Sequence, residues 1–220
     1  MITLYIVRHC QAMANVDKIF QGRFDGEITK TGERQLELLA NRFKDKKIDV
    51  VYSSYLTRAM LTAKAVTKYN NAPIIIDEDL AEIDVGDLER MSISLFEERY
   101  PEEYNNWFNN PKDFVAPNGE SMTDVYNRAK KALCNIINAQ NQNKTVAIVS
   151  HGCLIRNMFC HLQGLTLDKI NEIKFSDNTA VTKIQVNDNG EYNIIYERDV
   201  SHFDDDMKSR QTSKWYEKQQ

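Results

Sequence analysis

The sequence predicts an α/β protein: a three-layer α/β/α sandwich with a mostly parallel central sheet and a helical flap insertion. Two uninterrupted apolar runs, residues 3–7 and 145–149, are typical of strands buried on both faces, as strands of parallel sheets are. Segments with apolar residues at helical spacing separate the predicted strands. A chain of 220 residues is long enough for one domain in which helices cover both faces of such a sheet.

Both apolar runs end near a histidine. The first is followed by Arg8 and His9, and the second by Ser150, His151 and Gly152, where the chain must turn into a helix. Ligands of open α/β sheets bind at the carboxyl ends of the strands. One histidine at a strand end is more often a capping or hydrogen-bonding residue. Two imidazoles and a guanidinium at one edge indicate an anion site that contains a nucleophile or a base.

The composition argues against several classes of function. A net charge of −4 disfavours a general surface for nucleic acid or anionic membranes, because such surfaces need clustered lysine and arginine. No apolar run is long enough to span a membrane, and no secretory signal is visible before the first strand. The cysteines lack the density of a disulfide framework, so we expect reduced thiols and a cytoplasmic location. They are Cys10, Cys134, Cys153 and Cys160.

Three motifs follow one another along the chain: Arg8-His9, the run Ser53-Ser54-Tyr55-Leu56-Thr57-Arg58-Ala59, and Ser150-His151-Gly152. Together they resemble the histidine phosphatase superfamily, also called phosphoglycerate-mutase-like. The resemblance covers roughly the first 185 residues. It implies the α/β/α fold stated above and a phosphate site built from these motifs.

A polar loop, residues 11–27, follows the first strand. Long loops at the carboxyl end of a strand often carry function. The corresponding loop of the superfamily wraps the phosphate, and the resemblance implies binding roles for Asn15, Gln21 and Arg23. The alternative is a solvated turn that bends at Gly26.

The remaining elements follow in alternation. We expect helices over residues 31–46, 54–69 and 122–139, with another from Gly152 through His161, and strands over 49–53, 73–76 and 145–150. A predicted hairpin follows, with strands over residues 179–186 and 192–197 around Asn187-Asp188-Asn189-Gly190. Arg58 lies in the first turn of its helix, where the dipole disfavours a cation, so an anionic partner explains it better than a solvated face.

Seven carboxylates between Asp77 and Glu89 make the choice of a general acid ambiguous from charge alone. The superfamily places its acid in a Leu-x-Glu-x-x-x-Gly setting, which Leu80, Glu82 and Gly86 match. The resemblance therefore implies Glu82, whereas Asp84 and Asp87 are expected to be solvated or to cap turns. The chain departs from the family at Leu88-Glu89-Arg90-Met91, and at Cys10, where glycine is usual and a side chain would add bulk near the phosphate.

Residues 92–119 form the predicted flap, which contains several aromatic residues between prolines. These rings either hold the organic part of a substrate or form a small core beneath the flap. The run Pro117-Asn118-Gly119-Glu120-Ser121 resembles the phosphatase branch of the superfamily more than the mutases. A charged tail, residues 201–220, completes the single domain expected for residues 1–220.

These residues suit metal-independent hydrolysis of a small phosphate monoester. His9 would attack phosphorus as a neutral imidazole and form a phosphohistidine, and Glu82 would be the general acid and then the base for water. Arg8 and Arg58 supply planar cationic forks for the phosphoryl oxygens, with His151, Asn15 and Gly152 as further binding groups. No metal or other cofactor is required by this set.

Four alternatives stay open. The nearest is a phosphoglycerate mutase, whose insertion in this superfamily is longer and more basic than residues 92–119. A second is a phospho-ligand binding protein without catalysis. A zinc site at Cys10, Cys153 and the two histidines is disfavoured, because Cys-x-x-Cys spacing is absent and guanidinium groups beside a cation are costly. Cysteine-phosphatase chemistry lacks the expected arginine. Neither the natural substrate nor the oligomeric state follows from the sequence.

Overall fold

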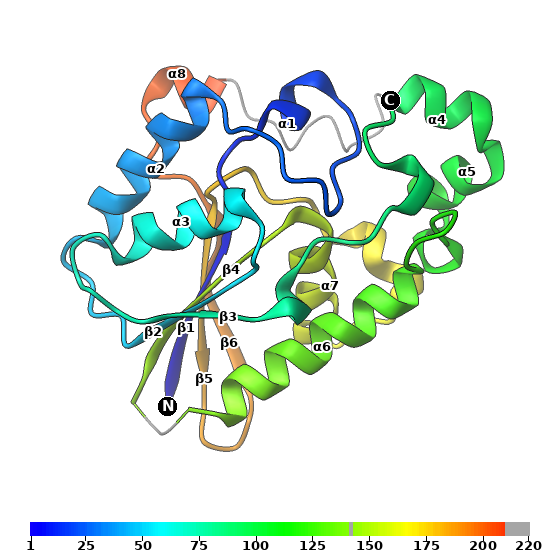
Figure 1. Ribbon diagram of the computed structural model, residues 1–220. Coiled ribbons are helices and arrows are strands. Elements are labelled where there is room, and N and C mark those ends of the chain that lie inside the picture. The colour runs from blue at the N-terminus through cyan, green and yellow to red at the C-terminus, as the bar shows by residue number, and fades with distance from the viewer. Residues whose placement is uncertain (141–142, 210–220) are drawn as a thin grey trace.

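The computed structural model describes residues 1–140 and 143–209, and its centre is a six-stranded sheet (Figure 1). The strands lie in the order β3-β2-β4-β1-β5-β6. The four strands from β3 to β1 are parallel, and β5 and β6 are antiparallel to their neighbours. Their bounds are β1 Ile2–Arg8, β2 Val50–Ser53, β3 Ile74–Ile76, β4 Thr145–Ser150, β5 Val181–Val186 and β6 Tyr192–Asp199.

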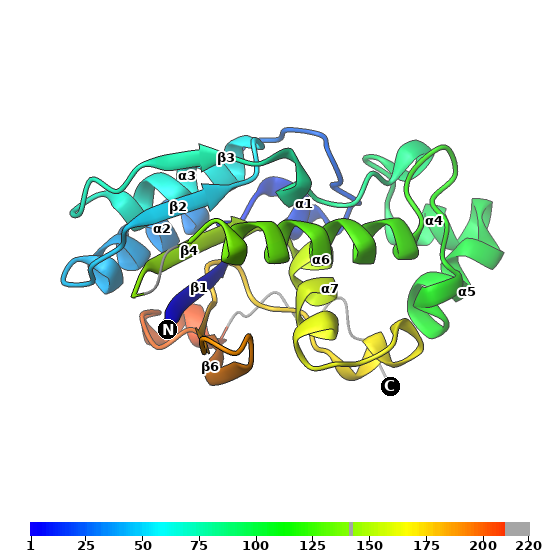
Figure 2. The same ribbon diagram turned by 90° about the horizontal axis from the view of Figure 1, so that it is seen from below.

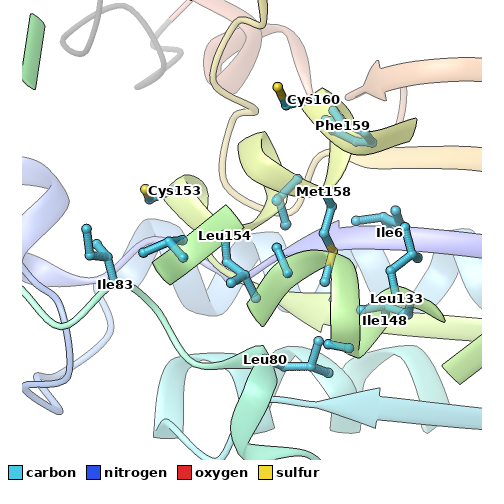
Figure 3. Packing of buried hydrophobic residues seen from close by; sticks show 14 of the residues in the cluster. Ile6, Leu80, Ile83, Leu133, Ile148, Cys153, Leu154, Met158, Phe159 and Cys160 are labelled. Carbon is cyan, nitrogen blue, oxygen red and sulfur yellow. The ribbon is translucent and has the colours of Figure 1, made fainter. Parts of the chain in front are cut away.

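Helices cover both faces of the sheet, which confirms the predicted three-layer fold (Figures 1 and 2). On one face, α2 (Lys30–Phe43) and α3 (Thr57–Thr67) pack their apolar stripes on alternate residues of the strands. On the other, α6 (Met122–Asn138) and α7 (Gly152–Leu162) form the larger core. Figure 3 shows Ile6 and Ile148 of the sheet against Leu133 and Met158 of these two helices.

The strand register brings the two histidines to one edge. Arg8 of β1 pairs with Ser150 of β4, and Ser53 of β2 pairs with Val149. The residues that follow these positions therefore leave the sheet side by side. Because parallel strands end at the same edge, the predicted meeting of His9 and His151 is a direct consequence of this register.

The loop after β1 is more ordered than the sequence analysis expected. Residues 11–27 contain a five-residue helix, α1 (Met13–Asp17), which ends at Lys18 in the left-handed conformation with φ 55°. The side chain of Asn15 caps this helix, because its Oδ1 accepts the backbone N–H of Ala12 at 3.0 Å. The segment was predicted as a plain polar loop because the helix carries no amphipathic pattern.

The flap is helical, as predicted, and consists of α4 (Ile93–Arg99) and α5 (Pro101–Asn109). Its rings pack mainly as core: Phe96 and Phe114 are fully buried, and Phe20 from the first loop contacts both Phe96 and Trp107 edge-on. Short 3₁₀ turns connect the remaining parts. They are Glu78–Leu80, Gly86–Leu88, Pro111–Asp113 and Leu167–Glu172.

Part of the predicted charged tail packs on the domain. Phe203 is buried, and a short helix, α8 (Asp205–Ser209), follows it. Residues 210–220 of the predicted tail lie outside the described residues. Within the described ranges, none of the helices is long and apolar enough to cross a membrane.

We predict that Gly86→Ala destabilises the protein far more than Gly164→Ala. Both glycines have positive φ, +50° and +66°, but a Cβ at Gly86 would lie 2.0 Å from the carbonyl oxygen of Pro117, whereas none of the described atoms lies within 4 Å of one at Gly164. Gly164→Ala should lower the free energy of unfolding by about 1 kcal/mol from backbone strain, and Gly86→Ala by more than about 2 kcal/mol. Urea unfolding measures both, and equal losses would contradict this account of the contact between Gly86 and Pro117.

Candidate active site

His9 lies at the end of β1, and its tautomer is fixed by the backbone. The ring is 3% exposed, and Nδ1 lies 2.6 Å from the carbonyl oxygen of Cys10. A carbonyl oxygen only accepts hydrogen bonds, so Nδ1 must carry the hydrogen. The lone pair of the neutral ring is therefore on Nε2, the nitrogen that a nucleophile of this kind needs free.

The environment of His9 keeps its ring neutral. Burial lowers the pKa of His9 well below 6.5, and the guanidinium groups of Arg58 and Arg8 lower it further. The hydrogen bond to Cys10 acts weakly in the opposite direction. At neutral pH the imidazole is therefore unprotonated at Nε2.

His151, at the start of α7, lies beside His9, with the two ring centroids 5.1 Å apart and the planes tilted by 49°. Its Nε2 is 2.8 Å from Oγ of Ser54, and within the described part of the chain its buried Nδ1 has no hydrogen-bond partner. We assign the Ser54 hydroxyl as donor to Nε2, which leaves the hydrogen on Nδ1 for an anion. Burial and then Arg58 hold the pKa of His151 well below its usual value.

Two buried arginines complete this part of the site. Arg8 donates from Nη1 to the carbonyl oxygen of Ser176 at 2.6 Å. Arg58, in the first turn of α3 as predicted, donates to the carbonyl oxygens of Phe24 and Gly22 at 3.0 and 2.8 Å. A Cβ at Gly152 would lie 3.4 Å from three guanidinium atoms of Arg8, which is van der Waals contact, so α7 begins directly beside that side chain.

The loop that Arg58 contacts is held from both sides. Arg58 binds its carbonyl groups, and the carboxylate of Glu89 accepts the N–H groups of Gly22, Arg23 and Phe24 at 2.8, 2.9 and 3.2 Å. The departure from the family pattern at residue 90 is accommodated locally: Arg90 adopts φ 65° and its guanidinium stacks on the ring of Phe24, 3.7 Å from the centroid. The sequence analysis assigned no role to Glu89.

Glu82 reaches the same edge from the segment after β3. It is 9% exposed, and its carboxylate accepts the N–H groups of Cys153 and Leu154 in the first turn of α7 at 3.1 and 3.2 Å. Its own segment is fixed by Arg128, which donates to the carbonyl oxygens of Asp79 and Ala81 at 2.9 and 2.7 Å and is also hydrogen-bonded to Glu120. Arg128 was not singled out from the sequence, because on a helix it is indistinguishable from a solvated arginine.

Asn15 lies within the buried cluster around His9. Its Oδ1 accepts from Asn178 at 3.3 Å, and Asn178 also donates to the carbonyl oxygen of His9 at 3.0 Å. The oxygen of Asn15 is thus engaged within the fold, so only its amide nitrogen is suited to bind an anion. Asn178 was missed by the sequence analysis, since it lies in a turn without a motif.

The other two loop residues point elsewhere. The side chain of Arg23 is 41% exposed and forms long ion pairs with Asp84 and Glu120 at 3.6 and 3.5 Å. It lines a surface hollow of about 360 Å³ together with Tyr55 and Arg128. Gln21 lines a different, small pocket that contains Glu82. Their predicted roles in phosphate binding stay predictions.

The side chain of Cys10 points away from the two histidine rings. Its Sγ lies 3.7 Å from the carbonyl oxygen of Arg58, on the α3 side, and its backbone N–H donates to Thr62. Burial raises the pKa of its thiol to about 11. Across residues 1–140 and 143–209, no three His, Cys, Asp or Glu side chains are grouped to hold a metal ion.

The sequence comparisons identify the family. A family model for the histidine phosphatase superfamily (branch 1) matches residues 4–196. The chain belongs to this superfamily. This histidine phosphatase is 35% identical over 169 residues to "Phosphoserine phosphatase 1" of Hydrogenobacter thermophilus, covering 77% of the chain and 80% of the relative.

Two further relatives cover more of the chain. "Phosphoglycerate mutase-like protein 4" of Arabidopsis thaliana is 30% identical over 205 residues, 92% of this chain and 87% of that protein. The solved structure of Bacillus stearothermophilus YhfR superposes with a TM-score of 0.86 at 30% identity, covering 92% of this chain and 99% of that one. The predicted family, fold and class of enzyme are confirmed.

A second, half-buried histidine network adjoins the backbone of Arg8. Arg42 donates to Nδ1 of His202 at 3.0 Å, so the neutral ring carries its hydrogen on Nε2, which donates to Oγ1 of Thr179 at 3.3 Å. Thr179 in turn donates its backbone N–H to the carbonyl oxygen of Arg8 at 3.0 Å. Burial and the charge of Arg42 lower the pKa of His202 to about 4.

We predict that this network weakens in acid. Between pH 6.5 and about 4 the unfolded chain binds a proton at His202 and the folded chain does not, so the free energy of unfolding falls as the pH falls. From pH 8 to pH 5 the wild type should lose about 2 kcal/mol more than His202→Asn, in which this proton uptake is absent. Urea unfolding at both pH values measures the difference; parallel losses in the two proteins would refute a depressed pKa at His202.

Proposed function

We propose that the protein is a metal-independent phosphomonoester hydrolase that acts through a phosphohistidine on His9. The observation that carries the proposal is the tautomer of His9: a neutral ring with its lone pair on Nε2, between two buried guanidinium groups and a second imidazole. Few reactions need a neutral nucleophile in so cationic a surrounding, and phosphoryl transfer from a dianionic ester is one of them.

In the first step, the lone pair of His9 Nε2 forms a bond to phosphorus as the ester P–O bond breaks. The electron pair of that bond goes to the alcohol oxygen, which takes a proton from Glu82. Arg8, Arg58 and His151 donate hydrogen bonds to the phosphoryl oxygens, and Asn15 adds a neutral donor through its amide nitrogen.

In the second step, water replaces the alcohol. The carboxylate of Glu82 takes a proton from the water while the water oxygen attacks phosphorus. The N–P bond breaks, and its electron pair returns to Nε2 of His9. Inorganic phosphate leaves and Glu82 is again protonated. The hydrogen bonds from the first turn of α7 to the Glu82 carboxylate support this double role. That turn directly follows His151, so it holds Glu82 close to the bound phosphoryl group in both steps.

The phosphatase activity is favoured over a mutase activity by the flap. A mutase acting on phosphoglycerates would need basic side chains around the bound sugar acid, whereas the aromatic rings of residues 92–119 pack against the apolar core. The relatives include proteins with phosphatase and with mutase-like names. The cytoplasmic location stays a prediction; all four cysteines are free thiols.

We expect hydrolysis of p-nitrophenyl phosphate in the presence of EDTA, and its loss by at least about 1,000-fold in His9→Ala, which has no nucleophile. Rapid acid-free quenching with a ³²P-labelled ester should trap label on the wild type and none on the variant. A phosphoglycerate mutase assay run in parallel is the control. Turnover in the mutase assay without hydrolysis of p-nitrophenyl phosphate would indicate a phosphoglycerate mutase. Binding of phosphate without either activity would indicate a non-catalytic protein.

We also expect Glu82→Gln to slow the hydrolysis of an ester more strongly when its alcohol is a poorer leaving group. An alkyl phosphate needs a proton on its leaving oxygen, so kcat/KM should fall by about 100-fold or more, whereas p-nitrophenyl phosphate, whose anion is stable, should lose much less. Asp84→Asn is the matched control, since Asp84 is the neighbouring carboxylate and accepts from Gly86 N–H instead. Equal losses for both esters in Glu82→Gln would argue against a general acid at this position.

A further inference from the structure

A turn of four residues, 176–179, takes over the contacts of β1 where the pairing of β1 with β5 ends. The paired residues stop one position before Arg8. Beyond that point, the backbone N–H of Thr179 donates to the carbonyl oxygens of Arg8 and His9 at 3.0 and 3.3 Å. The turn also binds the side chain of Arg8, since the carbonyl oxygen of Ser176 accepts from its Nη1 at 2.6 Å. It therefore contacts the two residues with which the proposed phosphate site begins.

The backbone of this turn is strained. Thr179 has φ 56°, in the left-handed region that a β-branched residue rarely adopts. Both Thr179 and the preceding Asn178 are fully buried. A residue in such a conformation persists only where its surroundings hold it there, and strain of this kind gathers at functional sites. The hydrogen bonds from Thr179 to Arg8 and His9 are among the contacts that hold it.

The side chain of Asn178 makes a second contact with the same strand end. Its Nδ2 donates to the carbonyl oxygen of His9 at 3.0 Å and to Oδ1 of Asn15 at 3.3 Å. A main-chain carbonyl only accepts, so the contact with His9 determines which end of the Asn178 amide is the nitrogen. The atom of Asn15 that faces this nitrogen must then be an oxygen. The backbone of His9 thus orients Asn178, and Asn178 orients Asn15.

This orientation leaves one end of the Asn15 amide free. Its Oδ1 accepts from Asn178 and from the backbone N–H of Ala12, the latter at 3.0 Å. Its nitrogen donates to none of the described residues, and it is not one of the enclosed side-chain atoms that lack a partner. The nitrogen is therefore the polar atom of Asn15 that a ligand can reach. An amide rotated by half a turn would present its oxygen instead, which repels phosphoryl oxygens.

We propose that Asn178 is a positioning residue for phosphate binding: it holds the Asn15 amide with its nitrogen available for a phosphoryl oxygen. The inference rests on the proposed function, in which Asn15 is a neutral donor to the phosphoryl group. The carbonyl oxygen of His9 has Thr179 as another donor, so the distinct contribution of Asn178 is the one it makes through Asn15. The proposal gives a role to a turn that lies outside the motifs shared with the superfamily.

Asn178→Leu tests the proposal, because leucine has a similar shape and no donor. The carbonyl oxygen of His9 keeps the N–H of Thr179 in this variant. The oxygen of Asn15 keeps the N–H of Ala12, so neither acceptor is left without a partner and the variant should fold. We expect its Kd for inorganic phosphate, measured by calorimetry, to rise by about 3- to 10-fold, because the Asn15 amide has lost one of the two donors that orient it.

A double-mutant cycle with Asn15→Ala tests whether Asn178 acts through Asn15. Asn15→Ala alone should raise the Kd for phosphate by about 10-fold or more, because a hydrogen bond to a charged group is lost. Adding Asn178→Leu to this variant should raise the Kd further by less than about twofold. A structural role would act whether or not Asn15 is present, so the same factor in both backgrounds would overturn the proposal.

Asn157→Leu is the matched control. Asn157 is also fully buried, and its Nδ2 also donates to a main-chain carbonyl oxygen, that of Cys153 at 3.0 Å. None of the hydrogen bonds among the described residues joins it to Asn15. The Kd for phosphate should change by less than about twofold in this variant, and thermal melts compare its stability with that of Asn178→Leu. A rise in Kd as large as in Asn178→Leu would show that affinity follows the loss of a buried amide, which would contradict a positioning role.

The binding measurement needs no turnover, so it separates this inference from the proposed function. If the wild type hydrolyses no ester but binds phosphate with the expected coupling between Asn15 and Asn178, the positioning role is supported and the proposed activity fails. If the wild type hydrolyses esters and the cycle shows no coupling, the activity is supported and the role of Asn178 fails. A wild type that binds no phosphate would overturn both.

Discussion

The site depends on one pairing, the parallel alignment of β1 with β4. Arg8 lies opposite Ser150 in this register, so His9 and His151 emerge together and their rings meet at 5.1 Å. A shift by one residue would turn the apolar side chains of a fully buried strand to the opposite face and separate the histidines, so the core and the site enforce the same alignment. The packing of Ile6 and Ile148 therefore contributes to the geometry of the imidazole pair.

Backbone groups hold most of what surrounds the histidines. The loop of residues 22–24 has its N–H groups on Glu89 and its carbonyl groups on Arg58, and the segment that carries Glu82 has its carbonyl groups on Arg128. Both arrangements satisfy buried peptide groups with charged side chains, which form stronger hydrogen bonds than neutral ones. The charged groups of the site are therefore held in place by their hydrogen bonds to the backbone, with few direct contacts between one charged group and another.

Much of this was predictable from the sequence. The apolar runs and their terminal histidines predicted the sheet, its parallel pairing and the two imidazoles at one edge, because strand patterns and strand ends are local properties. The side chains that brace the site, Glu89, Arg128 and Asn178, were not predicted. The backbone groups that they bind lie 46 to 169 residues away along the chain, and no local pattern distinguishes these side chains from solvated residues. The helix α1 was missed for a similar reason: it is short and lacks an apolar face.

The hydrogen bond between His9 and Cys10 involves a main-chain carbonyl as acceptor. Every amino acid brings the same carbonyl group, so the tautomer of the nucleophile does not depend on which side chain follows it. The side chain at position 10 faces Arg58 and Thr62 in α3 and is constrained only by the room there. A side chain that fits against α3 can therefore occupy position 10, where the family pattern has glycine, without changing the tautomer of His9.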